Sequence, residues 1–215
     1  MIKKQISFFA LLFLIMVTPV MSSHFAEAAP PAAVLSENDL KELKKVEDYF
    51  NNIQTLQASF FQSARNGNAM GTIYMRLPGE IRVEYAPPMP VLIVASNRLV
   101  SYYDTELQQL TEAPLSSTPL ALMLQKPFTL RKDITITKIA ITPQELQIIM
   151  YQTSEPDAGM LELVFSRTPF QIKYWKIIDN AGRTTQVSLG NIQLNIPLAN
   201  NLFIRPSAPE RRDFR

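Results

Sequence analysis

The chain lacks most of the side chains that carry out enzyme chemistry. Its 215 residues include no cysteine, and the single histidine, His24, lies near the N-terminus. Imidazole suits proton transfer near neutral pH, and histidine and cysteine supply most zinc and copper ligand sets. Only six glycines occur, without a Gly-x-Ser-x-Gly motif or a glycine-rich phosphate loop. The composition therefore favours a binding protein over an enzyme, with no metal and no cofactor.

Acidic residues need separate attention, because a pair of carboxylates alone can catalyse glycoside hydrolysis. Glu80, Glu84, Asp104 and Glu106 fall at predicted turns or on outward faces of predicted strands. Solvated carboxylates are ordinary at such positions. We therefore expect no catalytic residues.

Long apolar runs are scarce, and the clearest is N-terminal. Residues 1–28 read as a signal peptide, because Lys3 and Lys4 precede the apolar run 6–17 and Ala26-Glu27-Ala28 offers a small-x-small cleavage pattern. The run is shorter than the roughly twenty residues of a bilayer-spanning helix, although an uncleaved anchor is the alternative. Residues 29–215 would then form one exported domain with a flexible N-terminal leader, held without disulfides.

The charge balance of the exported part is nearly neutral. Cleavage after residue 28 removes two lysines and one glutamate from 21 basic and 19 acidic residues, leaving a net charge of +1. This balance does not point to nucleic acid as a partner.

One amphipathic helix is predicted near the start of the domain. Ser36 can cap its first amides, and Glu37 and Asp39 favour the positive end of a helix. The apolar stripe follows a period of three and four residues. It consists of Leu40, Leu43, Val46, Phe50 and Ile53.

After this helix the apolar period changes to two, which is typical of strands. We expect strands at 56–61, 72–77, 81–85, 91–95, 99–103, 106–111, 134–139, 146–151, 160–165, 172–178, 184–189 and 192–196. Residues 118–125 instead predict a short apolar helix, with Thr118 as its cap and Pro119 in its first position. Residues from Pro206 onward form a polar tail.

The predicted fold is mainly β. Short links imply antiparallel neighbours, and a sheet of about eleven strands must curl or close to protect its edges. A strongly curved antiparallel sheet forming an incomplete β-barrel lidded by helices satisfies this need. A two-sheet sandwich is the alternative.

Six segments, in their order and spacing, resemble a known family. They are LQASFFQ (56–62), GTIYMRLPGEIRVEY (71–85), SNRLVSYYD (96–104), TPLAL (118–122), DNAGRT (179–184) and FIRP (203–206). The chain resembles the periplasmic outer-membrane lipoprotein carriers, the LolA family, over about residues 37–206. The resemblance implies an incomplete barrel lidded by helices that shields acyl chains during passage through the periplasm.

One position departs from the family pattern. The family usually has an arginine directly before the proline, facing the barrel and holding the lid, whereas this chain reads Arg76-Leu77-Pro78. Leu77 shares a face with Ile73 and Met75, and Arg76 lies on the other face. Either a bulge lets Arg76 act as the lid-holding cation, or the protein closes its lid without one; we favour the second.

The resemblance and the alternation together predict an acyl-chain cavity. Its expected strand residues are Leu56, Phe60, Ile73, Met75, Leu77, Ile81, Val83 and Tyr85, and its lid residues are Leu120, Leu122, Met123 and Leu124. Methionines are flexible fillers suited to a cavity that empties and refills. The candidates are Met70, Met75, Met123, Met150 and Met160. Periodicity alone equally fits a filled core.

The implied function is that of a monomeric periplasmic chaperone for acylated lipoproteins. It would receive them from an inner-membrane ABC-type exporter and deliver them to an outer-membrane receptor. The alternative keeps the fold but changes the role, to a carrier of another lipid or a lipoprotein-sensing regulator.

Overall fold

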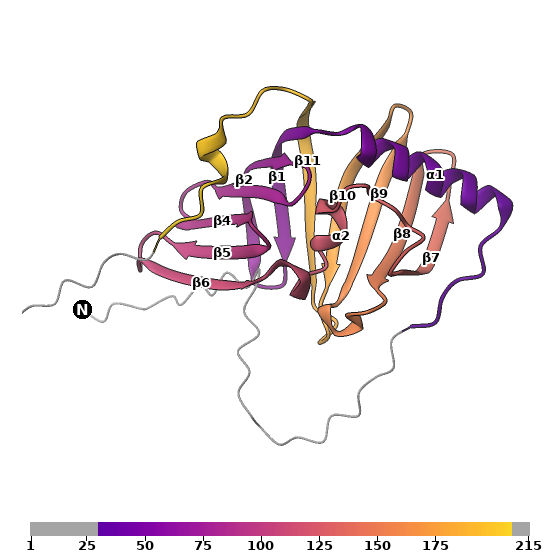
Figure 1. The fold of residues 1–215 in the computed structure, drawn as a ribbon, viewed down its shortest axis with the longest axis horizontal. Helices are drawn as coiled ribbons and strands as arrows, with labels where there is room; N and C mark the ends of the chain where they lie inside the picture. Colours follow the sequence, from indigo (N-terminus) through magenta and orange to yellow (C-terminus); the bar gives the residue numbers. More distant parts are fainter. Residues whose placement is uncertain (1–29, 208–215) are drawn as a thin grey trace, which may run out of the picture.

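The computed structural model describes residues 30–207. The predicted signal peptide, 1–28, lies outside the described residues, as does most of the predicted polar tail. Figure 1 shows one long helix and a broad, strongly twisted sheet. The elements are α1 (Glu37–Asn52), β1 (Thr55–Ala64), β2 (Gly67–Arg76), β3 (Glu80–Tyr85), β4 (Val91–Ser96), β5 (Leu99–Asp104), β6 (Gln109–Pro114), η1 (Leu115–Ser117), α2 (Ala121–Leu124), β7 (Ile134–Ile141), β8 (Glu145–Gln152), η2 (Pro156–Ala158), β9 (Met160–Arg167), β10 (Phe170–Ile178), β11 (Thr184–Leu194) and η3 (Asn200–Phe203).

All eleven strands form one antiparallel sheet in the order β6-β5-β4-β3-β2-β1-β11-β10-β9-β8-β7. The first six strands form one meander and the last five a second, joined where β1 pairs with β11. β6 and β7 remain unpaired with each other, and residues 115–133 connect them. The predicted open barrel with helical cover is confirmed, and the two-sheet sandwich is wrong because a single sheet contains every described strand.

Helix α1 begins where the sequence predicts. The Ser36 hydroxyl accepts a hydrogen bond from the Asp39 amide at 3.2 Å, and the Asp39 carboxylate accepts one from the Ser36 amide at 2.8 Å, which completes a capping box. Val46 and Phe50 are buried against the sheet, whereas Leu40 is 40% exposed. Leu40 was expected in the buried stripe, but it lies near the helix end that extends past edge strand β7 (Figure 1).

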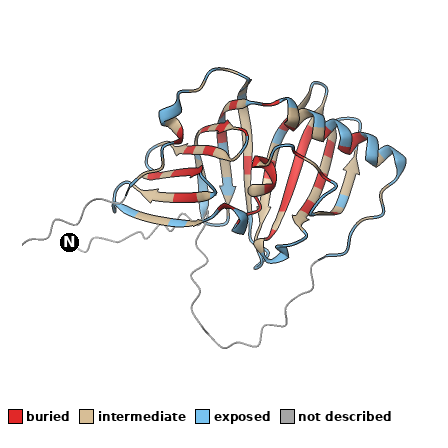
Figure 2. Cartoon of the chain, in the orientation of Figure 1, coloured by how far each residue is buried: buried red, intermediate tan, exposed pale blue. Residues whose placement is uncertain are grey.

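The strands bury alternate residues, as expected for a sheet covered on one face. In β1, Leu56, Ala58 and Phe60 are buried, whereas Phe61 is 45% exposed on the outer face. Figure 2 shows buried residues concentrated on the central strands and on α2, while the outward side of α1 is exposed.

Two strand predictions change. The predicted strand 106–111 is replaced by β6, because the Asp104 carboxylate accepts hydrogen bonds from the amides of Glu106 and Leu107 and closes a turn there. The predicted strands 184–189 and 192–196 are one strand, β11. A β-bulge at residues 190–193 lies where a break between two strands was expected. Gln57 and Ser59, two residues apart in β1, pair with Gln193 and Gly190, three residues apart in β11.

The predicted helix 118–125 shrinks to the single turn of α2, preceded by η1. Thr118 is not its cap, because the Thr118 hydroxyl donates to the Leu115 carbonyl oxygen at 2.9 Å instead. Within residues 30–207, no helix has both the length and the hydropathy needed to cross a membrane.

Candidate functional site

The predicted cavity residues share the inner face of the sheet. Strand pairing aligns them in rows, with Leu56 opposite Met75 and Met75 opposite Ile81. Seven of the eight are buried, and Tyr85 is partly buried and packs against the same core. The buried seven are Leu56, Phe60, Ile73, Met75, Leu77, Ile81 and Val83.

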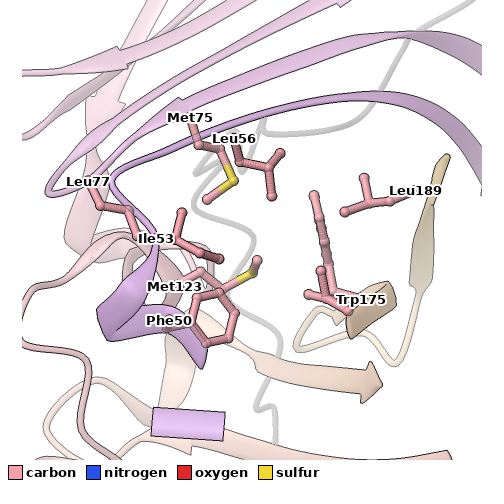
Figure 3. A pocket seen from close by; sticks show the side chains of 9 residues that line it. Phe50, Ile53, Leu56, Met75, Leu77, Met123, Trp175 and Leu189 are labelled. Carbon is pink, nitrogen blue, oxygen red and sulfur yellow. The ribbon is translucent and has the colours of Figure 1, made fainter. Parts of the chain in front are cut away.

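The centre of this inner face holds a small apolar cavity beneath α1 and α2 (Figure 3). Four predicted site residues line it: Leu56, Met75, Leu77 and Met123. The others are Phe50, Ile53, Ile172, Trp175 and Leu189. Phe50 and Ile53 belong to the predicted stripe of the first helix. Ile172, Trp175 and Leu189 were missed, although β10 and β11 show the same alternation as the strands that were used.

The free space inside this lining is only about 10 Å³. That volume is close to the minimum for one water molecule, so no acyl chain fits in this conformation. Figure 3 shows the reason, since Phe50 from α1 and Met123 from α2 point toward Met75, Trp175 and Leu189 from the sheet. The expected hollow interior is therefore closed here, and the helical residues occupy it.

The four predicted lid residues are buried, and Met123 is the one among them that lines the cavity. Leu120, Leu122, Met123 and Leu124 are each at most 6% exposed and belong to the same core as the inner sheet residues. One backbone hydrogen bond ties the end of α2 to the β2–β3 turn, from the Gly79 amide to the Leu124 carbonyl oxygen at 2.8 Å. Gly79 has a φ of +82°, a conformation that favours glycine in this turn.

The segment after the lid is fastened to α1 by side chains. The Asn51 amide group makes two reciprocal bonds to the backbone of Phe128, donating to its carbonyl oxygen at 2.9 Å and accepting from its amide at 2.8 Å. Glu47 accepts from the Leu130 amide at 2.8 Å. The Lys126 ammonium donates to the Ile53 carbonyl oxygen at 3.0 Å, at the C-terminal end of α1. We call these three contacts the α1 ties.

Leu77 and Arg76 lie on opposite sides, as the sequence predicts. Leu77 is 8% exposed and lines the cavity. Arg76 forms an ion pair with Glu80, donates to Asn200 Oδ1 at 2.6 Å, and lies 4.4 Å from the centre of the Phe203 ring. The guanidinium thus binds the C-terminal segment on the outer face, and the proposed lid-holding role of Arg76 has no contact to support it.

Arg82 supports the same C-terminal segment. Its guanidinium pairs with Glu84 two residues further along β3, at 2.6 Å, and donates to the Leu202 carbonyl oxygen at 3.1 Å. Arg82 and Glu84 therefore pair within one strand, on the same face of β3.

The candidate methionines divide into two groups. Met75, Met123 and Met150 are at most 2% exposed. Met70 is 59% exposed and pairs across the sheet with Phe61 on the outer face, so its prediction as an interior filler is wrong. Met160 is half-buried.

Titratable groups are absent from the cavity lining, which is wholly apolar. Among residues 30–207, no cluster of three or more histidine, cysteine, aspartate or glutamate side chains could hold a metal ion. What this site can do chemically is exclude water from a hydrocarbon surface.

The comparisons with known proteins agree with this geometry. A model of the family described as outer membrane lipoprotein carrier protein LolA matches residues 51–205. The chain belongs to this family. Within the LolA family, the outer-membrane lipoprotein carrier protein of Dechloromonas aromatica is 28% identical over 183 residues, which cover 77% of this chain and 85% of the relative. That of Methylococcus capsulatus is 25% identical over 178 residues, covering 78% and 85%.

A solved structure shares the fold. The putative outer membrane lipoprotein-sorting protein domain from Vibrio parahaemolyticus superposes with a TM-score of 0.50 and 9% sequence identity, over 75% of this chain and 94% of that chain. At this identity the likeness supports the LolA fold and nothing further.

Proposed function

We propose that this protein is a periplasmic carrier that shields the acyl chains of lipoproteins between the inner and outer membranes. Membership of the LolA family supports the carrier role. The observation that carries the proposal is the wholly apolar lining under a small lid fastened by a few hydrogen bonds. Such a lid can move aside without unfolding the sheet.

The cost of exposing hydrocarbon explains why such a carrier is needed. Each methylene exposed to water costs about 0.8 kcal/mol. A sixteen-carbon chain therefore costs roughly 12 kcal/mol, and a lipoprotein carries several chains. The lining can accept a chain if the side chains of α1 and α2 withdraw. Met75 and Met123 are suited to this change because their unbranched side chains repack at low cost.

The implied partners follow from the proposed route. Acylated lipoproteins would be received from an inner-membrane ABC-type exporter and passed to an outer-membrane receptor. The carrier would act as a monomer, without a metal, a cofactor or nucleic acid.

A release assay tests this proposal. The purified protein is incubated with spheroplasts, and the supernatant is examined for lipoproteins, with mass spectrometry identifying what remains bound. We expect soluble complexes that contain one lipoprotein and one carrier molecule. Release of free lipid alone would overturn the lipoprotein role.

A second role has one specific observation in its favour. Leu77 lines the cavity where the family resemblance expects a lid-holding arginine, so the lid here is governed by other contacts. A carrier of another lipid or a lipoprotein-sensing regulator would fit this difference. Release of free lipid in the assay above would favour this second role.

A further inference from the structure

The inner face of the sheet changes from apolar to polar along β1. Its inward residues run from Leu56, near the lid, through Ala58 and Phe60 to Gln62. The first three are buried, whereas Gln62 is only partly buried. Tyr85 lies at the same end, on β3, and is also partly buried. One end of the interior is therefore dry, and the other carries hydrogen-bonding groups.

Gln62 and Tyr85 are held in fixed positions. The Tyr85 hydroxyl donates to Gln62 Oε1 at 2.6 Å, and the Tyr85 ring meets the Phe60 ring edge to face, with centroids 5.2 Å apart. Gly71 lies between these rings in the strand pairing, and a Cβ there would come within 2.8 Å of the Phe60 ring. Because Gly71 has no side chain, the Phe60 and Tyr85 rings can approach each other over its backbone on the inner face of the sheet.

Tyr102 adds a second hydroxyl next to this end, one inward row nearer the lid than Tyr85. It lies in the row of Val83 and Ile93 on the inner face and is half-buried. Burial raises the pKa of Tyr85, and the nearby Tyr102 raises it further. Burial also raises the pKa of Tyr102, so both hydroxyls stay protonated as donors near neutral pH.

Donor capacity remains unused at this end. Within residues 30–207, Gln62 accepts from Tyr85 through Oε1 while its Nε2 group has no partner, and the Tyr102 hydroxyl has none either. A carbonyl group that leaves water without a donor loses the free energy of its hydrogen bonds. The lining near the lid presents only apolar surface to the cavity.

The spacing between the two ends suits an acyl chain. Six residues of strand separate Leu56 from Gln62, which corresponds to about 20 Å. One leaflet of bilayer hydrocarbon is roughly 15 Å thick. A chain of that length with its methyl end beneath the lid would bring its carbonyl group to the row of Phe60 and Tyr85, one inward residue short of Gln62.

We infer that Gln62, Tyr85 and Tyr102 form an ester-binding rim, which donates hydrogen bonds to the carbonyl groups that join acyl chains to a glyceryl head. The inference rests on the proposed function and deepens it, because it assigns recognition of the acyl ester as well as of hydrocarbon. Tyr85 orients Gln62, and Gln62 and Tyr102 supply the donors.

Binding of matched ester and ether ligands tests the rim. The ligands are a synthetic lipopeptide with a dipalmitoylated glyceryl-cysteine, the same lipopeptide with ether links, and free dipalmitoylglycerol. We expect the wild-type protein to bind the ester lipopeptide about tenfold more tightly than the ether, because two neutral hydrogen bonds are lost in the ether. Tyr102→Phe combined with Gln62→Leu should reduce this ratio to about one and leave ether binding within about twofold.

The control is Tyr103→Phe, because Tyr103 pairs with Leu92 and projects from the outer face of the same strand. This variant should keep the wild-type ratio. Tyr102→Phe alone, expected to lower the ratio about threefold to fivefold, serves if the double variant does not fold.

The outcomes separate the rim from the carrier role. Equal binding of ester and ether by the wild-type protein, or a double variant that keeps the ester preference, overturns the rim and leaves the carrier proposal standing. Failure to bind any of the three ligands overturns both. If the lipopeptide ester binds more tightly than dipalmitoylglycerol, the rim recognises lipoproteins in particular. If dipalmitoylglycerol binds equally tightly, the rim recognises the glyceryl ester of any lipid.

Discussion

The two halves of the sheet are built differently, although one meander continues into the other. Beneath α1, strands β8 and β9 bury Leu146, Ile148, Leu161, Leu163 and Phe165 completely. An aromatic cluster joins this half to the helix, with Tyr49 edge-on to Phe165 at 5.4 Å and Phe165 stacked on Phe170 at 5.1 Å. The half formed by β1–β6 carries the predicted cavity residues of β1–β3 and the ester-binding rim, and its β2–β3 turn is bonded to the lid in the connection that follows β6.

This difference separates stability from binding. The Arg167 side chain also pairs with the buried Glu42 of α1 at 2.9 Å, which holds the helix on the second meander. The lid, by contrast, is held by the Gly79 bond and the α1 ties. We therefore expect the backbone of the α1 half to act as a rigid frame, within which the Phe50 side chain can withdraw, and the lid to rearrange when a ligand binds.

The largest effect on stability is expected from removing a buried aromatic side chain in the rigid half. Phe165→Ala should lower the free energy of unfolding by about 3–5 kcal/mol, because Phe165 is fully buried among aromatic rings. Urea unfolding measures the loss, and binding of an acyl probe to the folded variant should stay near the wild-type value. Phe61→Ala, on the outer face, is the control and should change stability by less than about 1 kcal/mol. A large loss of probe affinity in Phe165→Ala would contradict the division into two halves.

Charging the lid should give the opposite pattern. Leu122→Asp is expected to weaken acyl-probe binding by about 100-fold and to lower global stability by only about 1 kcal/mol, since a short lid can open locally. Ser116→Asp places the same charge on an exposed residue of the same connection and serves as the control. Equal losses of binding and stability in Leu122→Asp would instead indicate a permanently filled core.

Loosening the α1 ties should have a moderate effect. Asn51→Ala removes both bonds to Phe128 and should cost about 1–2 kcal/mol of stability. The measurement that isolates the lid is hydrogen exchange of the Phe128 amide, which should accelerate more than the amides of β8. Asn52→Ala, at the exposed neighbouring position, should leave this exchange unchanged; acceleration in both variants would show that α1 itself has frayed.

The smallest effect concerns pH, at the edge of the rigid half. Hydrogen bonds from Ser154 and Gln152 lower the pKa of Asp133 below its ordinary value. A lowered folded-state pKa contributes stability above the unfolded-state pKa and loses it as the pH falls. Thermal unfolding between about pH 5 and pH 2 should therefore show a smaller acid-induced loss in Asp133→Asn than in the wild-type protein. Asp157→Asn is the control, and an identical pH profile for both variants would contradict the assignment.

The sequence was sufficient to place the inner face but not to say how full it is. Alternation identified Leu56 and Met75 correctly, because period two decides the side of a strand. It could not connect them with Trp175 and Leu189, which meet them only through the curl of the sheet. The alternation is also the same whether the space enclosed by the sheet is filled or hollow. The sequence pattern therefore could not predict that only about 10 Å³ is free.

Local competition explains the errors in element boundaries. Threonine is a common helix cap, yet the Thr118 hydroxyl donates a hydrogen bond to the Leu115 carbonyl oxygen of the preceding turn instead. The break expected at Gly190 became a bulge, because pairing with β1 continues on both sides of it. In each case a nearby partner that the residue types do not reveal determined the outcome.

The pairing of β1 with β11 also has a consequence for how the chain matures. β1 gains its second neighbour only when residues 184–194 have been synthesised, long after β1 itself. Until then one side of β1 presents unsatisfied amides and carbonyls, which invite pairing with a foreign strand. Among residues 30–207, the sheet is thus completed by β11, and a chain truncated before β11 would keep an unpaired strand edge in the middle of its sheet.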